Sequence, residues 1–550
     1  MPTSKSTPMR GQKPQKCRSD GKATQTLKRK SSSLSDLDQT TTKRRRMDDG
    51  PIRMQKNVVK VFASHCKPNY AQPWCCDSPT SSTSTAFPVR LQNGKKVLVT
   101  NAHCVEYATL VQVKRHACEA KAVAKVLCFG HECDLSILEV DDEAFWKGLT
   151  PFRIAAHLPK LQDAVWVMGY PMGGESLSVT QGVVSRVDLV EYAQSGRDLL
   201  GIQIDAAINS GNSGGPAVDE QGRVVGISFE ALGQEEDAEN IGYIIPVVVL
   251  QHFIQDYMKN GKFTGFGSAA FAYQALESAS LRESLGLKQN ETGVRVKSVD
   301  PAGNSHGVLQ VNDVILEVDG KRVGNDATVV FERGRIPFEY VFQQGFVGDT
   351  CSLKVRRAEA QHPMMLNLSL QRKCSLVDNG LHVDLTSSPR SDAKKQSNPT
   401  GSVPVGPVPR YLIVGGLVFV PLNTPFLESA FGEDYASKRP EELTADLLSL
   451  VEDGVKEEAS HEAVVLTKVL ADPVNVGYTE MEYERLRTIN GVKVRNLSHL
   501  NDLVEQSCDK YLRFEFESKE MIVLERRKAE QSLARMLTQN MIPSARSAVL

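Results

Sequence analysis

The sequence predicts a mainly β protein of several domains that follow a disordered N-terminal tail. Its 550 residues are enough for about three or four domains of ordinary size. Short apolar segments, such as residues 97–99 and 135–138, stand beside turn residues, as strands do. Residues 293–323 contain further alternating segments separated by an Asn-Asp turn and an Asp-Gly turn, a pattern typical of a compact β-rich module.

Residues 1–56 are predicted to form the disordered basic tail. Residues 1–50 hold thirteen Lys or Arg and five Asp or Glu residues, a net charge of +8, with few large apolar residues. Such a segment cannot bury enough apolar surface to fold. Basic clusters at residues 28–30 and 43–46, separated by a twelve-residue Ser/Thr-rich spacer, are typical of a bipartite signal bound by a nuclear-import receptor.

The tail therefore predicts a nuclear location, with the cytoplasm or a plastid as alternatives. Two other interpretations stay open: an arm that touches RNA or DNA, and a solvated tail or organellar transit peptide. Aspartates at positions 36, 38, 48 and 49 argue against a transit peptide, because such peptides are poor in acidic residues.

Composition bounds the remaining function classes. The sequence has no run of roughly eighteen or more apolar residues and no apolar signal-peptide core, so we expect no membrane contact. Its eleven cysteines are odd in number and irregularly spaced, which favours free thiols in a reducing compartment. Cys75, Cys76, Cys104 and Cys133 leave a zinc site or redox control as an alternative. Because no CxxC pair occurs, we expect neither a metal nor a cofactor.

A glycine-flanked serine is the first candidate for chemistry. Ser213 lies in the segment Gly-Asn-Ser-Gly-Gly-Pro at residues 211–216. Glycines on both sides let the backbone adopt left-handed dihedrals and direct its N–H groups at a developing oxyanion. An ordinary glycine-rich turn would have a similar composition, so the segment needs partners elsewhere in the chain.

Those partners precede the serine in the order that nucleophilic catalysis needs. A serine must be activated by a base, and the base must be oriented by a carboxylate. His103 follows the apolar run at residues 97–99, and Asp134 precedes the alternating segment at 135–138. Each residue alone would more often be structural. Together they predict a Ser-His-Asp constellation of His103, Asp134 and Ser213.

Three segments resemble the signatures of a known family. Residues 100–103 (Thr-Asn-Ala-His), 133–138 (Cys-Asp-Leu-Ser-Ile-Leu) and 205–216 are similar to those of the Deg/HtrA serine endopeptidases, and the likeness continues through residues 222–227 and 240–246. It covers roughly residues 57–530. Within the family the chain most resembles the plant type of the nucleolus, which carries His-Glu-Cys-Asp at the aspartate and two PDZ domains, and this makes the nucleolus the finer expectation for its location.

The resemblance implies a chymotrypsin-like double β-barrel over residues 57–260. There Ser213 would be the nucleophile, His103 the base and Asp134 the orienting carboxylate, with the backbone N–H groups of Gly211 and Ser213 as oxyanion hole. The pocket for the residue before the cut would be lined by Ile208, Phe229 and Ala231 and would favour a modest aliphatic side chain. One strand departs from the family pattern, since residues 82–89 read Ser-Thr-Ser-Thr-Ala-Phe-Pro-Val where Gly-Ser-Gly-Phe is usual.

The resemblance also implies two peptide-binding PDZ modules. The first is expected at residues 261–375, then a flexible Ser/Pro-rich linker at 376–409, a PDZ-like domain at 410–530 and a tail at 531–550. The leucine spacing of residues 441–450 predicts a helix inside the second module. Its peptide-binding loop would comprise Gly415, Gly416, Leu417, Val418 and Phe419. The corresponding loop of the first module, residues 268–271, has an alanine where a second glycine is common.

The resulting expectation is an ATP-independent serine endopeptidase that cleaves unfolded or selected proteins. Its partners would be polypeptide substrates, peptide ligands of the PDZ modules, an import receptor and further copies of itself, as a trimer or a pair of trimers. The sequence contains no phosphate-binding Walker loop, so substrates must arrive extended. The alternative is a proteolytically inactive, PDZ-based holdase that uses the protease fold as a scaffold.

Overall fold

The computed structural model describes residues 51–229, 241–378, 408–433 and 443–550, except for residues 52, 333, 359, 361 and 374, together with Tyr435. The basic clusters of the tail, most of the expected linker and Ala231 lie outside the described residues. Two units are distinguished, Met1–Asp49 and Gly50–Leu550, and the described residues all belong to the second.

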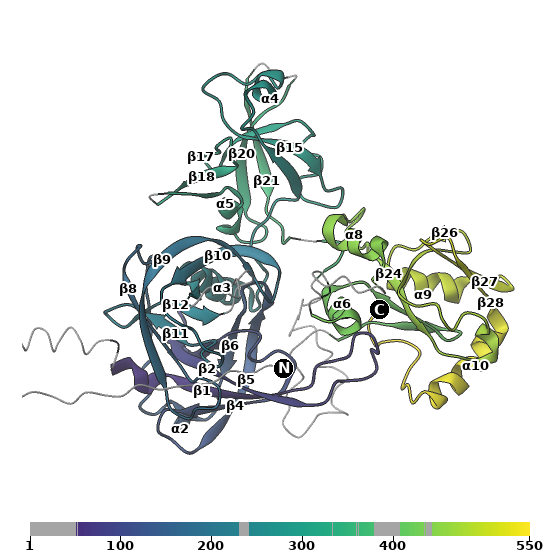
Figure 1. Cartoon of the computed structure of the whole chain (residues 1–550), viewed down its shortest axis with the longest axis horizontal. Coiled ribbons are helices and arrows are strands. Elements are labelled where there is room, and N and C mark those ends of the chain that lie inside the picture. The colour runs from purple at the N-terminus through teal and green to yellow at the C-terminus, as the bar shows by residue number, and fades with distance from the viewer. Residues whose placement is uncertain are drawn as a thin grey trace, which may run out of the picture. The chain divides into compact units, whose positions relative to one another are not determined.

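The first part of the described chain is a closed six-stranded barrel. Its strands are β1 (Val59–His65), β2 (Thr80–Arg90), β3 (Lys96–Thr100), β4 (Ala108–Arg115), β5 (Lys121–Gly130) and β6 (Leu135–Glu139). They follow the order β1-β2-β3-β6-β5-β4, and β1 closes the barrel by pairing with both β2 and β4. Figure 1 shows these strands in purple and dark blue. Val59, Val61, Leu98 and Leu138 belong to the buried core of this part of the chain.

A second sheet, antiparallel except for the parallel pair of β7 and β12, follows the barrel. Its strands are β7 (Arg153–Ile154), β8 (Ala164–Gly169), β9 (Ser178–Tyr192), β10 (Arg197–Ile204), β11 (Pro216–Val218), β12 (Arg223–Phe229) and β13 (Gly242–Pro246). Because β11 pairs with both β8 and β12, the path β11-β8-β9-β10-β13-β12 returns on itself. The short helix α2 (Glu143–Trp146) precedes this sheet, and α3 (Val247–Asn260) follows it. The expected mainly β fold with two barrels is thus observed.

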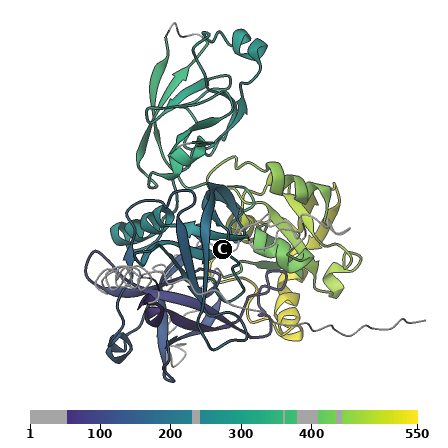
Figure 2. The same ribbon diagram turned by 60° about the vertical axis from the view of Figure 1, so that its left-hand side comes forward.

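The next module has a six-stranded sheet. It comprises β14 (Phe271–Ala275), β15 (Val294–Val299), β16 (Val314–Val318), β17 (Lys321–Arg322), β20 (Thr350–Arg356) and β21 (Met364–Ser369), with β14 at one edge. A hairpin of β18 (Thr328–Phe331) and β19 (Gly334–Pro337) and the helices α4 (Ala279–Ser284) and α5 (Glu339–Gln343) complete it. Figure 2 shows these strands in teal from a second side. The predicted Asn-Asp and Asp-Gly turns flank β16, where Asn312 and Asp319 have positive φ.

The C-terminal module again combines a sheet with helices. Its strands are β22 (Leu412–Val414), β23 (Leu417–Pro421), β24 (Val464–Val469), β25 (Glu484–Ile489), β26 (Val492–Lys493), β27 (Tyr511–Phe516) and β28 (Met521–Glu525). Its helices are α6 (Thr424–Phe431), α8 (Ala445–Asp453), α9 (Leu497–Gln506) and α10 (Arg526–Gln539). Helix α8 confirms the helix predicted from leucine spacing, and Leu447 and Leu450 are its buried residues. None of the described helices has the length and apolar character needed to cross a membrane.

The segment expected as a C-terminal tail is part of this module. Helix α10 extends to Gln539 and buries Ala529 and Met536. Beyond it, Ile413 donates its N–H to Ala545 O at 2.7 Å, and Ser547 donates its own to Tyr411 O at 3.1 Å. The prediction of a tail at residues 531–550 therefore differs from the structure. Because α10 is rich in charged residues, its narrow buried stripe is hard to recognise in the sequence.

Candidate active site

His103 and Asp134 meet through both oxygens of the carboxylate. His103 lies in the turn after β3, and Asp134 follows the one-turn helix η2 (His131–Cys133). Asp134 has the left-handed φ of 51°, which a short polar side chain tolerates better than most others. Its Oδ2 accepts a hydrogen bond from His103 Nδ1 at 2.8 Å, and its Oδ1 accepts one from the backbone N–H of His103 at 3.0 Å. The imidazole is therefore held in one orientation.

Opposing effects set the pKa of the His103 imidazole. Burial lowers the pKa of His103, but the negative charge of the buried Asp134, with the hydrogen bond between them, outweighs it and raises the pKa well above its usual value. The nearby His131 differs. Burial, aided by the positive charge of Arg372, lowers the pKa of His131 to about 3, so this imidazole is neutral.

Ser213 lies in a loop whose glycines are required by close packing. Gly211 has φ +94° and Gly214 has φ +80°. A Cβ at Gly211 would come within 2.5 Å of Tyr170 O, and one at Gly214 would clash with Thr85 O. Both positions thus exclude other residues by dihedral and by space.

The backbone N–H groups of this loop differ in whether they have acceptors among the described residues. Asn212 and Gly214 donate their N–H groups to Asn209 O and Ser228 O, at 2.9 and 3.1 Å. The N–H groups of Gly211 and Ser213 donate to no residue that the structure describes. These are the two donors expected to form the oxyanion hole.

The strand that departs from the family pattern is tied directly to this loop. In β2, the fully buried Thr85 donates its N–H to Ser213 O at 3.0 Å and its Oγ1 to Gly211 O at 2.9 Å. The same Oγ1 accepts the N–H of Tyr170 at 2.9 Å, and Thr85 O accepts from Thr100 Oγ1 at 2.8 Å. Thr85 therefore connects β2 to the serine loop without the usual glycines, while the hydroxyl of the neighbouring Ser84 is buried and has no hydrogen-bond partner among the described residues. Sequence reasoning missed Thr85, because only the tertiary fold brings β2 to the loop.

A cleft of about 850 Å³ joins these residues. His103, Gly211 and Ser213 line it together with Ile208 and Phe229, two of the three residues expected in the specificity pocket; the third, Ala231, lies outside the described residues. Phe229 packs against the fully buried Tyr192 with a ring-centroid distance of 4.5 Å, so a second aromatic ring supports this wall of the cleft from behind.

Glu106 adds an ionisable group to the same cleft. Burial, reinforced by the charges of Asp134 and Glu428 and opposed by Lys67, raises the pKa of Glu106 to about 7. This carboxyl therefore changes charge near neutral pH. Nothing in its sequence position indicated that property.

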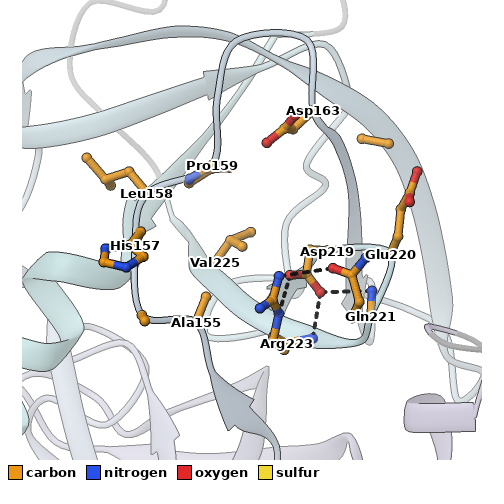
Figure 3. Close-up of a pocket in the computed structure, with 12 residues that line it drawn as sticks. Ala155, His157, Leu158, Pro159, Asp163, Asp219, Glu220, Gln221, Arg223 and Val225 are labelled. Atoms are coloured by element: carbon orange, nitrogen blue, oxygen red, sulfur yellow. Dashed lines mark hydrogen bonds and ion pairs between the residues drawn. The ribbon is translucent and has the colours of Figure 1, made fainter. Parts of the chain in front are cut away.

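A second cavity, of about 310 Å³, is formed by other residues. Figure 3 shows the segment from Ala155 to Pro159 on one side and the turn from Asp219 to Arg223 on the other. Arg223 Nε donates to Asp219 Oδ2 at 2.7 Å, which fixes that turn. None of the residues predicted for the active site lines this cavity.

The glycine loop of the C-terminal module differs from its expected role. Gly415 and Gly416 have φ values of +55° and +90°, but they form the turn between β22 and β23. Strand β23 pairs with β22 on one side and β24 on the other, so the edge on which a peptide would be added is occupied. Leu417, Val418 and Phe419 are fully buried. The expected open peptide-binding loop is absent at these residues.

The first module has the opposite arrangement. Strand β14 pairs with β15 and has no second strand partner among the described residues. The loop before it is fixed by Ser268, whose N–H donates to Gln371 O at 2.8 Å, and by Ala270, whose N–H donates to Asn304 Oδ1 at 3.0 Å. An edge for peptide addition is therefore present in the module whose loop has the less typical sequence.

Family models match two parts of the chain. The model of the trypsin-like peptidase domain matches residues 85–227, and that of the PDZ domain matches residues 404–549. The second match includes α10 and the pairing segment after it.

Similar proteins cover most of the chain. Protease Do-like 2, chloroplastic, of Arabidopsis thaliana is 42% identical over 494 residues, which are 90% of this chain and 75% of that protein. Putative protease Do-like 3, mitochondrial, of the same organism is 36% identical over 491 residues, 89% of this chain and 79% of that protein. Among solved structures, the HtrA-type protease AlgW with a tripeptide covers 60% of this chain and 97% of its own, with 23% identity and a TM-score of 0.46.

Proposed function

The chain belongs to the Do-like (Deg/HtrA) family of serine proteases, and from this we propose that it is an ATP-independent endopeptidase whose catalytic triad is Ser213, His103 and Asp134. The observation that carries the proposal is the two-point contact between Asp134 and His103, at 2.8 and 3.0 Å, in the cleft that also contains Ser213. The contact fixes the proton on Nδ1 and leaves Nε2 as the base.

In this mechanism Ser213 attacks the scissile carbonyl while His103 takes its proton. His103 then returns the proton to the leaving amine, and Asp134 stabilises the imidazolium formed in between. The N–H groups of Gly211 and Ser213 bind the oxyanion of the tetrahedral intermediate, which is consistent with their lack of described acceptors. Such a donor contributes about 3–4 kcal/mol to transition-state binding in comparable enzymes.

The proposed substrates are polypeptide segments that are already extended, from unfolded proteins or selected regulators. The sequence has no Walker loop, and the cleft has aromatic and aliphatic walls in Phe229 and Ile208. These walls support a preference for a modest aliphatic side chain before the cut. The free edge of β14 supports peptide capture by the first PDZ module, in place of the second.

The remaining parts of the proposal concern assembly and location. We propose a trimer, or a pair of trimers, and a nuclear or nucleolar location through the basic clusters of the tail. A fluorescent fusion that loses its nuclear signal when residues 1–50 are deleted would support import. Plastid or mitochondrial fluorescence would contradict it, and the names of both plant relatives make organelles the first alternative to examine.

The decisive experiment is fluorophosphonate labelling of the full chain, read at Ser213 by mass spectrometry, together with casein cleavage. We expect the wild type to be labelled and to cleave casein, and the Ser213→Ala variant to do neither, with a loss of order 10⁶-fold in kcat. Cleavage that survives the substitution would refute the nucleophile. Absence of cleavage and labelling in both forms would favour the holdase.

A further inference from the structure

Glu132 is a buried carboxylate with a role outside the triad. It lies two residues before Asp134, in the turn η2, and is only 5% exposed. Its Oε2 accepts the backbone N–H of Phe266 at 3.0 Å, and its Oε1 forms an ion pair with the buried Arg197. Arg372 Nε lies 3.9 Å from Oε2. The carboxylate of Glu132 thus forms a hydrogen bond and ion pairs with groups that lie far away in the sequence.

Arg197 holds the same segment from its other side. Its Nη2 donates to Phe266 O at 3.3 Å and to Gly267 O at 3.4 Å. The ring of Phe266 stacks on that of His252 in α3, with a centroid distance of 4.3 Å. Both backbone polar groups of Phe266 are therefore fixed by the Glu132–Arg197 pair.

The segment around Phe266 is the entry into the first PDZ module. Gly267 donates its N–H to Gly345 O at 3.1 Å, and Ser268 donates to Gln371 O at 2.8 Å. Arg372, which approaches Glu132, directly follows Gln371. The carboxylate of Glu132 therefore contacts both the segment that enters this module, at Phe266, and the segment that leaves it, at Arg372.

On its other side, Glu132 belongs to the turn that sets the position of Asp134. Asp134 donates its N–H to His131 O at 3.0 Å, and Ser195 Oγ donates to the carbonyl of Glu132 at 3.1 Å. A buried carboxylate that loses its partners is strongly destabilised, so the turn and its partners must move together. We infer that Glu132 is a positioning residue that couples the seating of the first PDZ module to the orientation of Asp134. The inference rests on the proposed catalytic role of Asp134.

Two substitutions test the coupling from opposite ends. Glu132→Gln keeps an oxygen that can accept the N–H of Phe266 but removes the charge opposite Arg197. Gly265→Ala changes only the entry segment, where its Cβ would lie 2.9 Å from Glu132 Oε2. Gly261→Ala is the matched control: this glycine is also left-handed, with φ +70°, but its Cβ would meet nothing within 4 Å.

The primary readout is the rate of fluorophosphonate labelling at Ser213 per folded molecule, measured against pH. We expect Glu132→Gln and Gly265→Ala to lower this rate by about 10- to 100-fold, as small misplacements of catalytic groups do. We also expect the acid limb of the labelling–pH profile of both variants to lie at lower pH than that of the wild type. The reason is that a weaker contact with Asp134 would raise the pKa of His103 less than the wild-type contact does. Glu132→Ala should lose more than Glu132→Gln. A merely structural role would lower Tm without moving the limb.

Hydrogen exchange of residues 131–135 supplies a readout independent of catalysis. We expect faster exchange there in Gly265→Ala than in Gly261→Ala. Equal exchange, and equal labelling of both variants per folded molecule, would overturn the coupling. Failure of the wild type to label would overturn the proposed function instead, and exchange would still decide whether the two segments are coupled.

Discussion

Two glycine-rich loops of this molecule have similar sequences and different surroundings. Residues 211–215 surround Ser213, residues 415–416 precede β23, and in both loops glycines adopt positive φ. In the first loop the N–H groups of Gly211 and Ser213 donate to no described residue, and both residues line a cleft. In the second, the following strand is paired on both sides. A glycine-rich loop therefore predicts a backbone conformation, and what lies opposite its N–H groups decides whether it can bind a ligand.

The largest effect should come from removing the negative charge of Asp134, the carboxylate that contacts His103 beside the first loop. We expect Asp134→Asn to lower kcat by about 10⁴-fold, because the imidazole loses its orientation and its counter-charge. Asp134 raises the pKa of His103, and only the neutral imidazole acts as base, so wild-type activity falls as pH drops through that raised pKa. In the variant the acid limb should move to lower pH. A pH profile of kcat/KM tests this, and an unmoved limb would contradict it.

The next effect concerns the open loop itself. Gly211→Ala places a Cβ 2.5 Å from Tyr170 O and forces the loop away from φ +94°. We expect a loss of about 10²–10³-fold in kcat with KM less affected, since one oxyanion donor is displaced. Steady-state kinetics on a peptide substrate measures both constants. An effect confined to KM would place Gly211 outside the oxyanion hole.

A smaller effect is expected where β2 supports the open loop. Thr85→Val preserves shape but leaves Gly211 O and the N–H of Tyr170 without the hydroxyl, at a cost of about 1–3 kcal/mol in unfolding free energy. Ser213 labelling should slow as well. Thr467→Val is the matched control, since Thr467 is equally buried and its hydroxyl donates to Val418 O in the C-terminal module. Equal labelling rates in the two variants would show that Thr85 supports stability alone.

The smallest effect on catalysis should come from the closed loop. A Cβ at Gly416 would clash with the Asn475 amide and lie 2.6 Å from Leu470 O, so Gly416→Ala should lower the unfolding free energy by about 1–3 kcal/mol. Below its lowered Tm, the variant should label at Ser213 as fast as wild type. Thermal denaturation measures the loss of stability, and labelling at roughly 20 °C below Tm measures the reactivity of Ser213 in the folded protein. Slow labelling of folded protein would link this loop to the active site.

Local patterns in the sequence predicted the strands, the helix at α8 and the ordered set of His103, Asp134 and Ser213. These features depend on neighbouring residues: an apolar run before the histidine, glycines around the serine, leucines at helical spacing. The structure places His103 in contact with Asp134, and His103 and Ser213 line the same cleft. The role of Thr85 and the partners of Glu132 were not predictable in this way. Thr85 contacts Gly211 and Glu132 contacts Phe266, and each of these partners lies more than a hundred residues away in the chain.

The sequence alone determined which residues are candidates for the proposed chemistry and which backbone positions favour glycine, since both follow from side-chain type and local dihedral preference. Only the tertiary structure decided that, among the described residues, β14 has one unpaired edge while β23 is paired on both sides. It also decided that residues 545–547 pair with residues 411–413 as part of the C-terminal module. Strand pairing and burial depend on contacts between distant segments. The free energy of these contacts depends on which segment packs against the strand, and the local sequence does not specify that segment.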